Sequence, residues 1–330
     1  MSVYDELNST SRAARLVHAI VVFPTAHLRP CPWRYGQGSG TGGLTMKRIF
    51  VIGVTLFAAH AALFAQDPAS RQNPDSVSEA RHIMDASIAA AQRCWQTRLQ
   101  YSYVERDASR RRDADGRVRS EDVAISRTIL VNGIPFEQLV ERNGHPPSSW
   151  EAWRQAEAIE KLKQETSEER VKRLREQTEL MTSLVEEVPK AFDVDLVGQE
   201  VIHGRMAYVI QATPHPGYEP RGKYGRFFSK VEGRLWIDTQ DLGWMKVEAQ
   251  VIKPLSIGLF VVRLLRGSHI TMEQTRVDDG TWMPLRVEVR ADAKLFLVKS
   301  LAIDRVLTYS EYRKETLTSR SLTASLPTPR

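Results

Sequence analysis

The segment 192–314 most constrains the fold, because it is a succession of short alternating stretches separated by turns that contain glycine. The turns lie at 203–204, 241–243 and 279–280. Turns of this kind join adjacent strands of a β-hairpin. Consecutive hairpins make neighbouring strands antiparallel, which excludes a doubly wound parallel sheet.

The stretches 244–251 and 282–290 carry apolar side chains at every second position. These positions are Met245, Val247, Ala249 and Val251 in the first stretch, and Met283, Leu285, Val287 and Val289 in the second. Charged or amide side chains fill most of the positions between them. A period of two predicts strands with one apolar and one wet face, so the apolar face needs a cover.

Further strands are predicted on either side of this segment. Residues 101–107 and 123–133 are rich in Tyr, Val and Ile, and a turn at Asp115-Gly116 separates them. Asn132-Gly133 and Asn143-Gly144 bound a short strand at 134–141, and a last strand is expected within 301–314. The Ser/Thr-rich tail, 316–330, is predicted to be disordered.

Helices that could cover the sheet are few. One is predicted at 76–97, two more in a charged insert at 148–188, and 254–267 is a further candidate. Capping boxes, in which Ser or Thr is followed three residues later by Glu, mark the helix starts at Ser76/Glu79, Ser148/Glu151 and Thr166/Glu169. We therefore expect an α+β fold in which a large curved antiparallel sheet, an incomplete barrel, wraps over helices. An incomplete cover would leave an apolar cavity.

The stretch 46–65 has the three parts of a secretory signal peptide. Lys47 and Arg48 precede an apolar run, and small residues lead to Ala65. The run is short for a bilayer span, which needs about 20 residues; a buried core helix and an internal membrane anchor are the alternatives. We expect Met46 to be the natural start, 1–45 to be a disordered extension, and 66–75 to be an exposed leader. The protein is then periplasmic, and it is not itself lipidated because Gln66, not cysteine, follows the cleavage site.

The net charge and the cysteine count of the chain change when residues 1–65 are excluded. They hold six of the 46 Lys and Arg residues and two of the 40 Asp and Glu residues, which leaves a net charge of +2 for the rest. A nucleic-acid partner is therefore not expected, because domains that bind nucleic acid are usually clearly basic on one face. Cys94 is the one cysteine left, so an internal disulfide or a cysteine-based zinc site is not expected. Its apolar helical setting favours a buried structural cysteine over a thiol nucleophile.

Three phrases, VGQEVIHGRMAYVIQATP, GRLWIDTQDLGWMKVEA and DDGTWMPLRVEV, give the chain a family resemblance. Together with the early helix and the antiparallel ladder, they resemble the LolA/LolB-like lipoprotein-carrier superfamily, which includes sensor domains of the RseB type. The resemblance covers roughly 76–313, within an expected domain at 76–315, and departs from compact carriers at the insert 148–188. It implies an incomplete barrel over helices that binds an acyl chain of a lipid or lipoprotein. We expect the protein to be a monomer.

The apolar positions of the sheet are consistent with binding of an acyl chain. Each buried CH₂ of such a chain contributes about 0.8 kcal/mol, and its burial needs no polar motif. The candidate lining of the cavity is Leu235, Ile237, Met245, Val247, Phe260, Val262, Met283, Leu285 and Val287. Ordinary core is the alternative for each of them. Phe260 and Val262 lie between Pro254 and Gly267 and are candidates for a flap over the sheet.

Motifs that carry chemistry are absent from the sequence: it has no Gly-rich phosphate loop, no Gly-x-Ser-x-Gly and no His-Glu-x-x-His. No catalytic residue, metal ligand or cofactor is predicted. The segment 213–228 could bind an anionic head group or an acidic partner, but a solvated loop is the simpler interpretation. Trp236 and Trp282 are expected in the core. Three hypotheses remain: a lipid or lipoprotein carrier, a sensor or interaction domain for an envelope membrane protein, and a hydrolase with an unrecognised site. His203 or His215 within hydrogen-bond reach of a buried carboxylate at a pocket mouth would favour the hydrolase.

Overall fold

The computed structural model describes residues 74–113, 115–220, 222–257, 262–277, 280–295 and 299–315. The predictions for 1–45, for the signal peptide 46–65 and for the tail 316–330 lie outside these residues, as does nearly all of the leader 66–75.

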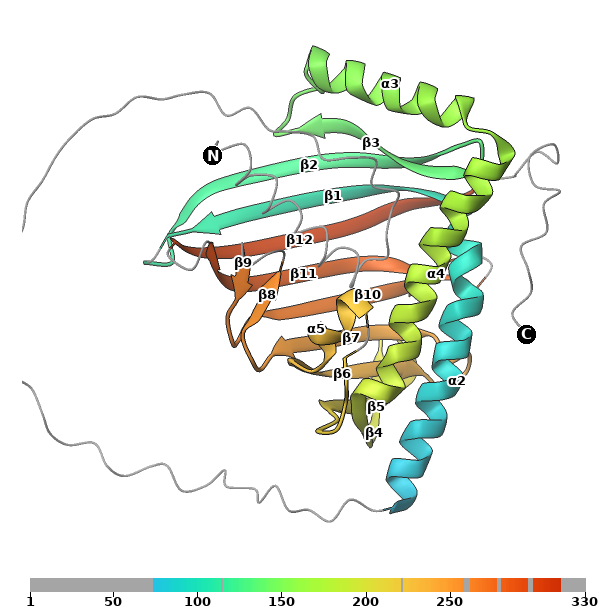
Figure 1. The fold of residues 1–330 in the computed structure, drawn as a ribbon, viewed down its shortest axis with the longest axis vertical. Coiled ribbons are helices and arrows are strands. Elements are labelled where there is room, and N and C mark those ends of the chain that lie inside the picture. Colours follow the sequence, from blue (N-terminus) through green and yellow to red (C-terminus); the bar gives the residue numbers. More distant parts are fainter. Residues whose placement is uncertain are drawn as a thin grey trace, which may run out of the picture.

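One antiparallel sheet of 12 strands dominates the molecule (Figure 1). Its order is β3-β2-β1-β12-β11-β10-β7-β6-β5-β4, and the short hairpin β8–β9 pairs with β11 beside this path. The strands are β1 (Tyr101–Arg112), β2 (Val118–Val131), β3 (Ile134–Arg142), β4 (Phe192–Ile202), β5 (Arg205–Pro214), β6 (Val231–Asp238), β7 (Trp244–Val251), β8 (Leu255–Ile257), β9 (Val262–Leu264), β10 (His269–Arg276), β11 (Trp282–Leu295) and β12 (Lys299–Lys314). Because β3 and β4 form the two ends of this path, the sheet is open. The predicted fold class is confirmed.

The glycine turns join the strands as expected. Asn132 and Gly133 have φ angles of 50° and 80° between β2 and β3, and His203 and Gly204 have 49° and 77° between β4 and β5. Two successive residues with positive φ are typical of the type I′ turn, whose twist matches that of the strands. The local sequence therefore sets the hairpin connections.

Among the described residues, four helices accompany the sheet: α2 (Pro74–Arg98), α3 (Ser149–Gln164), α4 (Ser167–Ala191) and α5 (Gly222–Phe228). Both capping boxes of the charged insert are present. In the second box, Thr166 Oγ1 accepts from the Glu169 N–H at 3.2 Å, and Glu169 accepts from the Thr166 N–H at 2.8 Å. Helix α2 begins two residues before the predicted cap at Ser76, at Pro74, whose fixed φ suits a first helical position.

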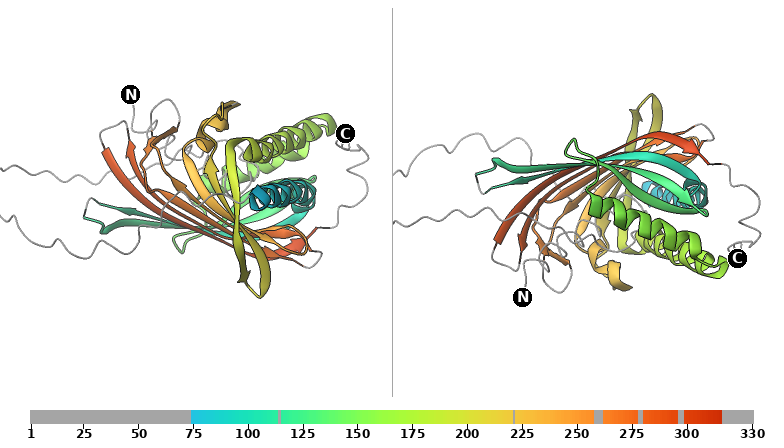
Figure 2. Two further views of the ribbon diagram at one scale, coloured as in Figure 1. Left: turned by 90° about the horizontal axis from the view of Figure 1, so that it is seen from below. Right: turned by 90° about the horizontal axis from the view of Figure 1, so that it is seen from above.

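The helices lie on the concave side of the curved sheet (Figure 2). Helix α2 contacts β4, β11 and α4, and α5 contacts α4 and β6. The main core is formed between these helices and the inner face of the sheet, with Met84, Ile210, Ile237 and Val287 almost fully buried. A second core lies beneath α3, where Leu162 packs with Ile134 and Phe136. The sheet thus wraps over helices, as predicted.

Two local predictions were wrong. The candidate helix at 254–267 contains the strands β8 and β9 instead, which pair with each other and extend β11. Met245 was expected to share a face with Val247 and Val251. It packs instead with Trp236 and Val209, whereas Val247 and Val251 belong to the main core. The cause is a β-bulge where β6 meets β7, which adds one residue to β7 and reverses the alternation there.

Candidate functional site

An apolar pocket of about 140 Å³ lies between the helices and the inner face of the sheet. Val185 and Val188 of α4 form one wall, and Phe192 of β4 with Phe227 and Phe228 of α5 forms another. The side chains at this site come from segments far apart in the chain. The curvature of the sheet brings them together.

The three phenylalanines form an aromatic cluster. The Phe228 ring meets Phe192 edge-on at a centroid distance of 5.8 Å, and Phe227 at 6.0 Å. Edge-to-face packing of this kind adds about 0.5–1.5 kcal/mol beyond area burial. It ties the short helix α5 to the end of α4 and so closes one side of the pocket. The interpretation of 213–228 as a solvated loop was wrong for its last part, because Phe227 and Phe228 are buried.

The floor of the pocket is the sheet itself. Leu235 of β6, Val247 of β7 and Met272 of β10 lie side by side there. Gly233 is also part of the floor, and a Cβ at this position would lie closer than 3.0 Å to the Glu248 carbonyl oxygen. Glycine therefore permits the close approach of β6 and β7.

Trp244 fixes helix α2 over this floor. Its indole Nε1 donates to Ser87 Oγ at 3.0 Å, and Ser87 in turn donates to the Met84 carbonyl at 2.8 Å. Ser87 is fully buried. A buried hydroxyl needs such partners, because an unsatisfied buried polar group costs about 1–3 kcal/mol.

Charge is scarce around the pocket. Glu232 and Glu248 are the ionisable residues in its lining, and Glu248 forms an ion pair with Lys246 at 2.5 Å. The pocket therefore offers burial and shape rather than hydrogen bonds, as binding of a hydrocarbon chain requires.

The structure places the nine predicted lining residues in different environments. Leu235 and Val247 line the apolar pocket. Ile237 and Val287 lie in the main core, Met245 belongs to the cluster around Trp236, Met283 is buried and Leu285 is half-buried. Phe260 and the side chain of Val262 lie outside the described residues. Ligand binding by any of the nine stays a prediction.

Most of the pocket wall was missed because it comes from helices. The periodicity of 171–188 placed Val188 on an apolar helix face, but nothing in the sequence indicates that this face meets α5. The adjacent pair Phe227-Phe228 was the available signal, since two large apolar residues are unusual in a solvated loop.

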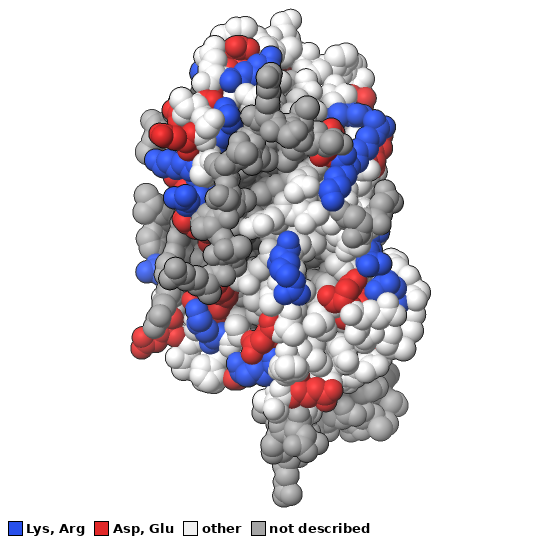
Figure 3. Space-filling view, turned by 90° about the vertical axis from the view of Figure 1, so that its right-hand side faces the viewer, with Lys and Arg blue, Asp and Glu red and all other residues white. Residues whose placement is uncertain are grey.

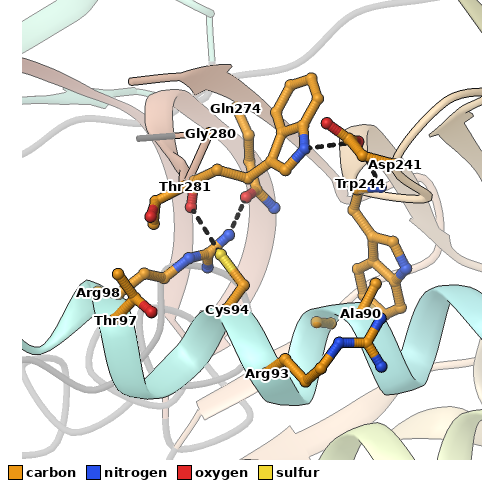
Figure 4. Close-up of a pocket in the computed structure, with 13 residues that line it drawn as sticks. Ala90, Arg93, Cys94, Thr97, Arg98, Asp241, Trp244, Gln274, Gly280 and Thr281 are labelled. Carbon is orange, nitrogen blue, oxygen red and sulfur yellow. Dashed lines mark hydrogen bonds between the residues drawn. The ribbon is translucent and has the colours of Figure 1, made fainter. Parts of the chain in front are cut away.

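A second pocket, of about 260 Å³, opens on the other side of Ala91 and Trp244, which border both pockets. Cys94 and Arg98, one helical turn apart on α2, lie in its wall (Figure 4). Trp282 also lines this pocket. Cys94 is half-buried rather than buried, because it faces this pocket, and its thiol donates to the Trp282 carbonyl at 3.6 Å. Arg98 donates to Gln274 Oε1, and burial lowers the pKa of Arg98.

The inner face also carries a buried carboxyl group. Glu105 of β1 lies opposite Tyr309 of β12 and is only 4% exposed. Burial raises the pKa of Glu105 well above its usual value, and the carboxylates of Glu137 and Asp107 raise it further. Asp107 itself is held by Arg305 at 2.6 and 2.8 Å, and it raises the pKa of Arg305 despite burial.

The histidines proposed for a hydrolase are on the surface. His215 Nδ1 lies 2.9 Å from Asp193 Oδ1, but both side chains are nearly half exposed. His203 lies 3.8 Å from Glu273, with its side chain 57% exposed. Neither pair has the buried carboxylate at a pocket mouth that a triad requires. Trp236 and Trp282 are buried, as predicted.

The described residues contain no group of three or more His, Cys, Asp or Glu side chains arranged to hold a metal ion. Within the same ranges, no helix is both long and apolar enough to cross a bilayer.

Comparisons with known proteins give only structural matches. No family model matches the chain, and no curated protein matches its sequence. A LolA-superfamily protein from Nitrosomonas europaea matches 73% of the chain and 96% of its own, with 13% identity and a TM-score of 0.29. A lipoprotein-sorting protein domain from Vibrio parahaemolyticus, described as putative, matches 74% and 95%, with 10% identity and a TM-score of 0.29.

A DUF1329 family protein from Desulfovibrio piger matches 73% of the chain and 95% of its own, with 14% identity and a TM-score of 0.28. The LolA superfamily that the sequence phrases resemble is thus represented among the matched structures. Identities and TM-scores this low give no information about ligands or site residues.

Proposed function

We propose that this chain is an exported, carrier-like protein that holds an acyl chain of a lipid or lipoprotein in the apolar pocket and performs no catalysis. The observation that supports the proposal is the pocket itself. Two valines of α4 and three phenylalanines face a floor of Leu235, Val247 and Met272, with little charge nearby. The signal-like stretch 46–65 supports export to the periplasm.

The pocket volume sets what it can hold. Ligand pockets usually measure about 300–1,000 Å³, and this one measures about 140 Å³. A complete acyl chain then requires α5 or α4 to move outward, and a short part of the chain fits without such movement. Because α5 has only seven residues, its displacement breaks few backbone hydrogen bonds.

A cavity-filling variant separates a binding pocket from ordinary core. Ala91→Leu adds three carbons at a helical position that borders the pocket. These carbons exclude about three methylene groups of a ligand, each contributing about 0.8 kcal/mol, so affinity for a fluorescent fatty acid should fall about 50-fold. The free energy of unfolding should change by less than about 1–2 kcal/mol, because added burial offsets packing strain.

Ala156→Leu is the matched control, since Ala156 is exposed on α3. It should leave fatty-acid affinity unchanged. Equal affinity in wild type and Ala91→Leu would contradict binding in this pocket. Native mass spectrometry of the protein purified from the periplasm should also detect bound lipid.

An interaction domain for an envelope protein is the second candidate. Helix α3 exposes Trp150 and Trp153, by 44% and 60%. Exposed tryptophans are unusual on a monomer and are enriched among residues that dominate binding energy at interfaces. The same mass spectrum distinguishes the two, because a copurified protein without lipid would favour this candidate.

A further inference from the structure

A hollow of about 310 Å³ lies on the outer face of the sheet, over β1, β12 and β11. Leu307 and Tyr309 of β12 point inward into the main core. Because side chains alternate along a strand, Val306 and Thr308 between them point outward, and both line the hollow. The sheet therefore separates this hollow from the apolar pocket.

Six arginines line the hollow, and the strand register places four of them around its floor. Arg106 of β1, Thr308 of β12 and Arg286 of β11 lie in one row across the three strands. Arg110, Asp304 and Arg290 lie in a second row, four residues along. Strands are about 4.8 Å apart and residues about 3.3 Å apart along a strand, so the arginines mark the corners of a rectangle of about 10 by 13 Å.

The floor between the two rows has two short side chains, on β1 and β12, and the carboxylate Glu288 on β11. Ala108 of β1 and Val306 of β12 pair directly, halfway between the arginine rows. Ala108 is 8% exposed although it faces outward, because the longer arginines overhang it. The hollow is thus a product of Ala108, which lies between Arg106 and Arg110 at alternate positions of β1, and of Val306 beside it.

The acidic residues nearby balance only part of this charge. Arg110 pairs with Glu121 at 3.0 Å, Arg286 with Glu288 at 2.5 Å, and Arg112 with Asp304. Arg106 and Arg290 are exposed and form no ion pair with any of the described residues. Two guanidinium groups at diagonal corners therefore remain uncompensated. On the face that carries α2 and α4, by contrast, charges of both signs are interspersed (Figure 3).

We propose that this hollow, with Arg106 and Arg290, docks the protein onto the phosphate head groups of an anionic phospholipid surface. Guanidinium groups bind phosphate with two parallel hydrogen bonds. The four arginines are too far apart to converge on one phosphate. They suit a surface that presents many phosphates, where each basic residue contributes independently and weakly.

Vesicle sedimentation tests the proposal. The full chain should bind vesicles of phosphatidylglycerol and phosphatidylethanolamine at low salt, and not vesicles of phosphatidylcholine alone. Binding should be lost at ~1 M salt, where the screening length is about 3 Å. The double variant Arg106→Gln/Arg290→Gln should bind about 30-fold more weakly, since each basic residue near a membrane contributes roughly fivefold.

The control variant Lys172→Gln/Arg175→Gln removes the same charge from exposed positions of α4 and should bind like wild type. Melting temperatures of both variants should match that of wild type, because the four residues are exposed. Fatty-acid binding in the apolar pocket should also be unchanged in Arg106→Gln/Arg290→Gln, which separates this proposal from the proposed function.

Three results would overturn the proposal. The first is equal vesicle binding by wild type and Arg106→Gln/Arg290→Gln. The second is that the wild-type protein does not bind anionic vesicles at low salt. The third is full competition by inorganic phosphate or by polyglutamate at concentrations that leave the vesicles intact, which would indicate a small anion or an acidic polypeptide instead.

Discussion

Replacing Gly243 with alanine should destabilise the protein severely, because the indole of Trp282 occupies the space of the new methyl group. An alanine Cβ at this position would lie closer than 3.0 Å to three indole atoms, Nε1, Cδ1 and Cε2. Real Cβ atoms essentially never approach so closely, so the indole or the 241–243 turn must shift. Gly243 is not among the glycines with positive φ, so the cost is steric and does not come from the backbone.

The magnitude follows from what Trp282 loses. Its side chain is 6% exposed and donates to Asp241 Oδ1 at 2.9 Å. Removing a buried aromatic side chain from its packing costs about 3–5 kcal/mol, and losing a hydrogen bond to a charged group costs about 1.5–3 kcal/mol. Because the displaced indole can regain part of its contacts, we expect Gly243→Ala to lower the free energy of unfolding by about 3 kcal/mol.

A double-mutant cycle measured by urea denaturation tests this mechanism. Trp282→Ala alone should cost about 3–5 kcal/mol. In Gly243→Ala/Trp282→Ala the methyl group has room, so the double variant should be no less stable than Trp282→Ala. The coupling energy would then be about 3 kcal/mol, beyond the usual 0.3–0.5 kcal/mol of independent sites.

Gly217→Ala is the matched control, because the nearest atom to its Cβ would be His215 Nε2 at 3.3 Å, on an exposed side chain. Its effect should stay within about 1 kcal/mol. Strictly additive effects of Gly243→Ala and Trp282→Ala would refute the steric argument and would locate the cost in the turn.

Two further predictions concern stability. Since the folded state raises the pKa of Glu105 above the ordinary value of 4.5, the free energy of unfolding should fall as the pH rises through the folded-state pKa. Glu105→Gln should remove this decline and raise the free energy of unfolding at about pH 8, as measured by urea denaturation across the pH range. Glu168→Gln, at an exposed position, is the control. An unchanged decline in Glu105→Gln would contradict the assignment to Glu105. Thr166→Ala should cost about 1 kcal/mol by removing the cap of α4, and no change in thermal unfolding would show that this end of the helix is not coupled to the fold.

The fold was predictable where a local rule acts alone. Asn132-Gly133 sets a turn through positive φ, and Thr166 with Glu169 sets a helix start through two hydrogen bonds. Both signals depend on neighbouring residues only, so they can be read from sequence. The alternation of apolar positions likewise predicted an open sheet with one buried face.

The site was predictable only in part, because it depends on contacts between distant segments. The bulge between β6 and β7 moves Met245 to the other face of the sheet, and no residue type in that stretch indicates a bulge. Cys94 was expected to be buried because α2 is apolar there, yet the pocket beside Trp282 leaves it half-buried. Phe227 and Phe228 belong to the site only because α5 packs against α4. Such contacts follow from tertiary packing and not from periodicity.

The two proposed binding surfaces lie on opposite faces and on different strands of one sheet, the apolar pocket on β4–β7 and β10 and the hollow on β1, β11 and β12. On β12, Leu307 and Tyr309 face the helices, while Val306 and Thr308 face the arginines. A one-residue slip in the register of β12 would exchange these two sets, moving Leu307 and Tyr309 out of the main core and destroying the hollow. The long pairings of β12 with β1 and β11 oppose such a slip. The cost of burying arginines or exposing leucines opposes it further. A sheet of this kind can therefore keep an apolar core face and a charged face only a single strand thickness apart, because pairing with both neighbours fixes the direction of every side chain.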